Sequence, residues 1–70
     1  MIKHLSTYYS DNGEGQAEIY VDLKQDQFHI TYVNAKGEKF FTEEFPGKSI
    51  HYLENAAENW ALGIKKLKND

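Results

Sequence analysis

The last third of the chain places an apolar residue at every third or fourth position, and this spacing strongly limits the possible folds. The intervals are 3, 4, 3, 4 and 3 along a stripe that consists of Ile50, Leu53, Ala57, Trp60, Ile64 and Leu67. At 3.6 residues per turn, such a stripe lies on one face of an α-helix. Ser49 is a candidate N-cap, and Gly63 interrupts the pattern at a cost of about 1 kcal/mol relative to Ala. We predict an amphipathic helix over about residues 49–68.

Strict alternation over residues 17–24 gives the clearest strand signal. The apolar positions of this segment are Ala17, Ile19, Val21 and Leu23. A period of two residues separates a buried face from a solvated face in a β-strand. The short polar segment at residues 24–27 follows, so a hairpin is expected there.

Residues 2–9 form a strand candidate of mixed character. The segment ends in Thr7, Tyr8 and Tyr9, which favour strands. In a regular strand one face would hold Ile2, His4, Ser6 and Tyr8. Neither face is purely apolar. The next residues, 10–15, contain Asn-Gly and a second Gly, and they predict a turn or loop.

Two more strands are expected at residues 28–33 and 38–45, with a turn at residues 34–37. The first of these places on one face Phe28, Ile30 and Tyr32. In the second, the adjacent Phe40 and Phe41 point to opposite sides of a regular strand. At least one side of this strand therefore needs a cover, which is the helix, a sheet closed on itself, or another subunit.

The predicted order is four hairpin-linked strands within residues 1–45 and then the helix. This order is typical of an antiparallel sheet with one covered face. We expect a mainly β fold with one helix: a strongly bent antiparallel meander or small barrel of four to five strands, with a C-terminal amphipathic helix. With 70 residues the chain has room for one domain, residues 1–70.

The composition of the chain excludes several classes of function. The chain has no Cys, which excludes disulfides and thiolate chemistry. It has eight Lys, no Arg and eleven acids, for a net charge of −3. The apolar stretches are far shorter than the about 20 residues of a membrane span, so we expect a soluble, cytoplasmic protein. So short a chain is marginal alone, which favours self-association.

No motif for catalysis or metal binding is present. His4, His29 and His51 lack the spacing of known metal sites. No Ser lies in a nucleophile motif, and the Gly-rich loop lacks the Lys and Ser/Thr that bind phosphate. We expect a non-enzymatic protein without metal or cofactor.

The sequence also contains residues that are candidates for binding nucleic acid. Loop lysines, Lys36 and Lys48 among them, lie at turns or strand ends, where they are expected to touch phosphate. The rings of Tyr20, His29 and Tyr32 are candidates for stacking on unpaired bases. A net charge of −3 disfavours polyanion binding by a monomer. A ring of identical subunits would repeat the local lysine cluster around its axis and so form a basic rim.

Two segments resemble sequences of the Sm/LSm family of small β-barrels. Residues 19–24, followed by a turn and Phe28, are similar to the opening hairpin of that family. Residues 45–50 resemble its second signature at Gly47 and Ile50. The resemblance implies a ring of subunits that binds RNA. Its matched positions are Asn34, which would contact a base edge, and Gly47.

The chain departs from the Sm/LSm pattern in three respects. The acid–Asn pair of the first signature is not clearly present, although Asn34 ends the corresponding strand. Pro46 stands where the family has an RNA-contacting Arg, and the helix follows the strands instead of preceding them. The sequence also resembles small proteins of marine, cyanophage type. That resemblance implies the cytoplasm of an infected bacterial host.

Three functions follow as hypotheses. The first is a ring-forming Sm-like protein that binds RNA or single-stranded nucleic acid. The second is a phage protein–protein interaction module that acts on a host protein, suggested by the acidic balance and the exposed rings. The third is a β-β-β-β-α binder of single-stranded DNA, which would dimerise through its helix.

Overall fold

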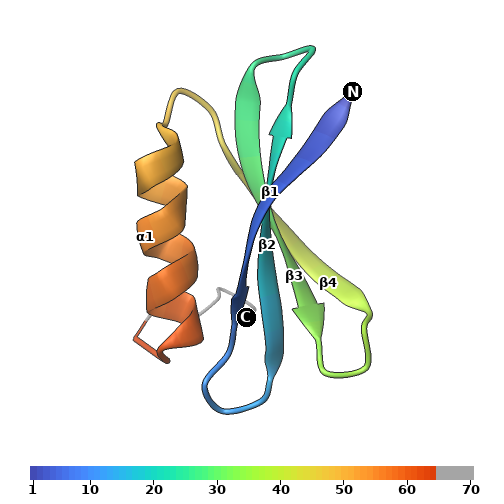
Figure 1. Cartoon of the computed structure of the whole chain (residues 1–70), viewed down its shortest axis with the longest axis vertical. Coiled ribbons are helices and arrows are strands. Elements are labelled where there is room, and N and C mark those ends of the chain that lie inside the picture. Colours follow the sequence, from blue (N-terminus) through green and yellow to red (C-terminus); the bar gives the residue numbers. More distant parts are fainter. Residues whose placement is uncertain (65–70) are drawn as a thin grey trace.

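The computed structural model describes residues 1–64 and contains four strands and one helix. Their bounds are β1 Ile2–Tyr9, β2 Gly15–Asp22, β3 Gln27–Asn34, β4 Lys39–Phe45 and α1 Ile50–Ala61. The strands form one antiparallel sheet in the order β1-β2-β3-β4, and α1 lies against one face of it (Figure 1). The predicted antiparallel meander with a C-terminal helix is confirmed. Of the two forms considered, the described strands adopt the open meander, with β1 and β4 at its edges.

The core lies between α1 and the sheet face that we call the inner face. Ala17 and Ile19 of β2 and Ile30 and Tyr32 of β3 are fully buried there. From the helix, the buried residues are Leu53, Ala56, Ala57, Trp60 and Ala61. The alternation in β2 and the apolar stripe of the helix thus face each other, as their periodicities predicted.

Leu23 does not join this apolar face, although the alternation placed it there. It is 53% exposed. The reason is local, because β2 ends at Asp22, whose carboxylate accepts hydrogen bonds from the backbone N–H groups of Lys24 and Gln25 at 3.0 and 3.3 Å. Such an Asx turn diverts the chain before Leu23 can point inward.

A β-bulge in β1 changes which residues share a face. His4 pairs with Tyr20, whereas Ser6 pairs with Ile19, so Leu5 is the extra residue. The bulge reverses the alternation after Leu5. The prediction that His4 and Ser6 share a face is therefore wrong: His4 lies on the outer face, opposite α1, and Ser6 lies on the inner face.

A second bulge lies in β4. Phe41 pairs with Tyr32 and Lys39 with Val33, which leaves Phe40 as the extra residue. The expectation that Phe40 and Phe41 point to opposite sides is wrong, because both rings contact Tyr32, with centroids 6.4 and 5.9 Å away. Phe40 nevertheless stays 51% exposed.

The helix is shorter than predicted and ends at Ala61. Gly63 adopts a φ of +84°, and its N–H bonds to the Trp60 carbonyl while the Ile64 N–H bonds to the Asn59 carbonyl. This pair of bonds is a Schellman motif, in which glycine ends a helix rather than interrupting it. Ile64 is 70% exposed and lies outside the core. Positions 65–68 of the predicted helix lie outside the described residues.

The helix begins where the sequence predicted. Ser49 occupies the N-cap position with extended backbone angles, although its side chain makes no capping hydrogen bond. The preceding Gly47, with a φ of +74°, lies in the turn that joins β4 to α1. The Lys48 N–H bonds to the Phe45 carbonyl at 3.3 Å across this turn.

Candidate functional site

The outer face of the sheet, opposite α1, carries a row of side chains that crosses all four strands. His4 pairs with Tyr20, Tyr20 with His29, and His29 with Glu44. The ring centroids of His4 and Tyr20 lie 5.3 Å apart at an interplanar angle of 57°. Those of Tyr20 and His29 also lie 5.3 Å apart, at 17°, and are stacked. We call His4, Tyr20, His29 and Glu44 the transverse row.

A second row lies beside the first on the same face. Its members, in register across the strands, are Thr7, Glu18, Thr31 and Thr42. The Glu18 carboxylate accepts hydrogen bonds from the Tyr20 hydroxyl at 2.6 Å and from the Gln16 amide at 2.5 Å. The bond to Glu18, together with partial burial, raises the pKa of Tyr20. The His4 ring is held in turn by Thr7, with 2.7 Å between Nε2 and Oγ1. The neighbouring side chains thus fix the orientation of two rings of the transverse row.

The charge of the outer face is negative. The two rows contain the carboxylates of Glu18 and Glu44 and no Lys. Lys39 pairs with Val33 nearer the other end of β3. A cation is therefore attracted to these two rows, whereas a phosphate placed on them meets two carboxylates.

Tyr32, predicted as a base-stacking ring, lies in the core. It is fully buried, and its ring packs against Trp60 at 5.1 Å between centroids. Its hydroxyl donates to the Glu43 carboxylate at 3.3 Å. The alternation of β3 places Tyr32 and His29 on opposite faces. Stacking of a base on Tyr32 is therefore excluded by its burial, whereas His29 lies on the open face.

Asn34, predicted to contact a base edge, has a structural role in the β3–β4 turn. Its Oδ1 accepts from the N–H groups of Lys36 and Glu38 at 2.9 and 3.0 Å. Its Nδ2 donates to the Glu38 carboxylate at 3.1 Å. These bonds use both acceptor positions of Oδ1 and one of the two N–H donors of Nδ2, so the amide cannot pair with a base edge through its oxygen without losing a turn bond.

The two predicted phosphate contacts lie at opposite ends of the sheet. Lys36 is in the β3–β4 turn, whereas Lys48 follows Gly47 in the connection from β4 to α1 (Figure 1). The Lys48 ammonium lies over the Tyr52 ring, 4.9 Å from its centroid. Within one copy of the chain, the predicted contacts are therefore divided between the two ends of the sheet, with Asn34 and Lys36 at one end and Gly47 and Lys48 at the other.

The site residues predicted from the sequence did not include three residues of the two rows, His4, Glu18 and Glu44. Glu18 was identifiable from the sequence, because it lies on the solvated face of the clearest strand. His4 and Glu44 were not, because their places in the row depend on strand register and on the Leu5 bulge.

The fold and this surface define an α+β protein in which one helix covers an antiparallel sheet and the other sheet face bears rings and carboxylates. No family model, curated protein or solved structure matches the chain. The Sm/LSm resemblance and the phage origin stay predictions.

Residues 1–64 contain no group of three or more His, Asp or Glu placed to hold a metal ion. In the same part of the chain, no helix has the length and apolar character needed to cross a membrane.

Proposed function

We propose that the protein is a protein-binding module whose transverse row accepts an arginine-containing segment of a partner. The observation that carries this proposal is the row itself, in which the stacked rings of Tyr20 and His29 end at the Glu44 carboxylate on the sheet face opposite α1. It corresponds to the second function predicted from the sequence, a protein–protein interaction module.

The chemistry of the row suits a guanidinium group. Tyr20 already stacks on one face of His29, and Glu44 lies opposite His29 on the neighbouring strand. A guanidinium that stacks on the second face of His29 would place its N–H donors beside Glu44. Arginine is planar and donates in a fork, so it can combine ring stacking with a carboxylate pair. Lysine can supply the charge but not the planar stack.

Charge favours a cationic ligand over a nucleic acid. The chain has a net charge of −3, and both rows lack Lys while holding Glu18 and Glu44. Affinity for a polyanion grows with the number of cations placed on its phosphates. The rings alone would suit unpaired bases, so RNA is the competing ligand in the test.

The test compares three labelled probes by fluorescence anisotropy. These are a short Gly-Arg repeat peptide, a Gly-Lys peptide of equal length, and a single-stranded RNA. We expect the arginine peptide to bind most tightly and the RNA not to bind at micromolar protein. Salt-sensitive RNA binding without arginine-peptide binding would overturn the proposal and favour the nucleic-acid function.

A matched pair of variants tests whether the peptide binds at the transverse row. Glu44→Gln removes one carboxylate from the row. It should lower the affinity for the arginine peptide about fivefold, which is the upper limit for the loss of an exposed ion pair. Glu14→Gln removes the same charge from the β1–β2 loop and should change the affinity much less. Equal losses in the two variants would mean that the peptide responds only to net charge, and would refute the assigned site.

A further inference from the structure

The backbone of β4 forms one edge of the sheet. Within residues 1–64, β4 pairs only with β3, and no strand lies beyond it (Figure 1). The Asn34 N–H donates to the Glu38 carbonyl at 2.9 Å in the β3–β4 turn, so the backbone of Asn34 faces β4. The direction of the backbone groups alternates along an antiparallel strand. The bulge residue of this strand pair belongs to β4, so the alternation along β3 is regular and Ile30 also faces β4.

This alternation identifies the residues of β4 that face away from the sheet. Ile30 pairs with Glu43, so the backbone groups of Glu43 face β3. The N–H and C=O groups of its two neighbours, Thr42 and Glu44, therefore face outward. Both of these residues are exposed, and their side chains lie on the outer face of the sheet. Glu44 is also the member of the transverse row at this edge, so a strand added beside it would continue the row.

We propose that the arginine-containing segment of the partner binds as an added strand, antiparallel to β4, with its arginine opposite Glu44. This inference rests on the proposed function and specifies how the partner's backbone is held. The arginine would exchange two backbone hydrogen bonds with Glu44, and its side chain would emerge on the outer face. Neighbouring strands lie about 4.8 Å apart, so this residue starts about 10 Å from His29, a distance that a long arginine side chain largely spans.

The other edge strand, β1, suits this partner less well. A bulge interrupts β1 in its middle, whereas the bulge in β4 leaves residues 41–45 regular. β1 carries Lys3 and contains no Asp or Glu. β4 has the adjacent carboxylates of Glu43 and Glu44 in its regular part, and Lys39 lies beyond the bulge. Charge therefore attracts an arginine to β4. The same carboxylates disfavour a second copy, because pairing β4 with β4 would bring like charges together.

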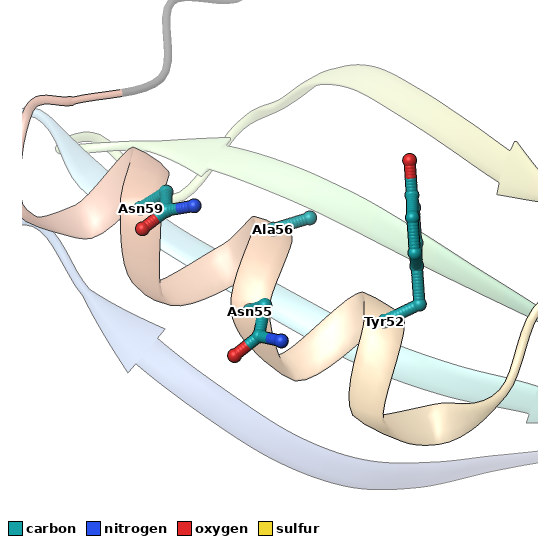
Figure 2. Close-up of a pocket in the computed structure, with 4 residues that line it drawn as sticks. All are labelled: Tyr52, Asn55, Ala56 and Asn59. Carbon is teal, nitrogen blue, oxygen red and sulfur yellow. The ribbon is translucent and has the colours of Figure 1, made fainter.

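Two phenylalanine rings remain partly exposed on the inner side of the β4 edge. Phe41 is half-buried and Phe40 is 51% exposed. Figure 2 shows Tyr52 pointing from α1 toward the side of β4, where its ring packs on Phe45 at 5.6 Å between centroids. The Lys48 ammonium lies over the Tyr52 ring, which leaves Phe40 and Phe41 as the apolar contacts for a partner. On an antiparallel added strand, the residue opposite Phe41 is three positions after the arginine, and we expect it to be apolar.

N-methylation of single peptide amides tests strand addition without changing the protein. The probe is a labelled Thr-Val-Arg-Val-Thr-Val-Thr peptide with capped ends, and its affinity is measured by fluorescence anisotropy. In the proposed pairing the arginine N–H donates to β4, whereas the N–H of the next valine points away from it. Methylation at the arginine should lower the affinity about tenfold, and methylation at that valine less than about twofold.

Strand addition and the proposed function fail in different ways in this test. If the peptide binds and both methylated forms lose affinity equally, strand addition is refuted and the arginine site stands. If a peptide with Lys in place of Arg binds equally well and keeps the alternating effect of methylation, the arginine preference is refuted and strand addition stands. If neither peptide binds, both proposals are refuted.

Thr42→Pro tests the same edge from the side of the protein. Proline has no N–H to donate, and at an outward-facing position of an edge strand it removes no bond within the sheet. The variant should lower the affinity for the strand peptide about tenfold. Ile2→Pro places proline at the start of the other edge strand, where Ile2 is exposed, and should change the affinity less than about twofold. Melting curves confirm that both variants fold, and similar affinities of the two would overturn the assigned edge.

Discussion

The rings of Tyr32 and Trp60 lie 5.1 Å apart, centroid to centroid, at an angle of 60°. Tyr32 belongs to β3 and Trp60 to the last turn of α1, so this contact joins the sheet to the helix. Tyr32 is fully buried and Trp60 is 7% exposed. Tilted ring pairs of this kind stabilise a core beyond the area that they bury.

Replacing Trp60 with Ala should unfold most of the protein under conditions where the wild type is folded. Truncation of a buried aromatic residue costs about 3–5 kcal/mol, a large part of the about 5–15 kcal/mol that stabilises a whole domain. Urea unfolding followed by circular dichroism measures the loss. Tyr52→Ala, which truncates a half-exposed ring on the same helix, is the control and should cost much less. An unchanged midpoint for Trp60→Ala would contradict the assigned core.

Tyr32 should make the folded state less stable in alkaline solution. Burial, and then the nearby Glu43 charge, raise the pKa of Tyr32 above its ordinary value of 10.0. The folded state therefore holds this proton more tightly than the unfolded state does. The stabilisation is complete below pH 10 and is lost as the pH rises toward the raised pKa. Unfolding free energies measured from about pH 9 to 11 should fall.

The variant Tyr32→Phe identifies the source of that alkaline loss. It removes the ionisable hydroxyl and should flatten the decline of stability with pH, although it also loses the 3.3 Å hydrogen bond to Glu43. Tyr9→Phe, at a ring that is 69% exposed, should keep the wild-type slope. A Tyr32→Phe slope as steep as that of the wild type would contradict the prediction.

Gly15 should tolerate no side chain. Its φ is +142°, and a Cβ at this position would lie 1.9 Å from the Val33 carbonyl oxygen, which is backbone of the paired strand. Gly15→Ala should cost about 3 kcal/mol, since β2 and β3 must separate. Gly13 also has a positive φ, +78°, but nothing lies within 4 Å of its Cβ position. Gly13→Ala should therefore cost only about 1 kcal/mol. Thermal melting compares the two, and similar losses would refute the close approach.

Replacing Gly63, in the Schellman motif, with alanine should destabilise the protein more than replacing it with asparagine. The φ of +84° at this position is unfavourable for residues with a Cβ, and asparagine tolerates it best. Gly63→Ala should cost about 1 kcal/mol, and Gly63→Asn about half of that. Chemical denaturation measures both. If Gly63→Ala were more stable than the wild type, the helix would continue through this position.

The sequence alone predicted every element of the fold, because the periods of strands and helices depend on local backbone geometry. The alternation from Ala17 to Val21 and the spacing from Leu53 to Trp60 both describe buried faces correctly. The predicted side-chain directions and the predicted end of the helix were wrong where a single residue interrupted the alternation of a strand or ended the helix. Leu5 and Phe40 are bulge residues, and Gly63 ends the helix instead of weakening it.

Local patterning therefore determined which segments are strands and helix and which of their faces are mostly apolar. Only the tertiary structure decided which residues meet across strands. The transverse row exists because β1, β2, β3 and β4 pair in one particular register. Each pairing is a contact between residues distant in sequence, and a shift by one residue would turn every side chain to the other face. Tyr32 is buried and His29 is partly exposed because α1 packs on the face that carries Tyr32. Contacts throughout the core between the helix and the sheet determine which face α1 covers.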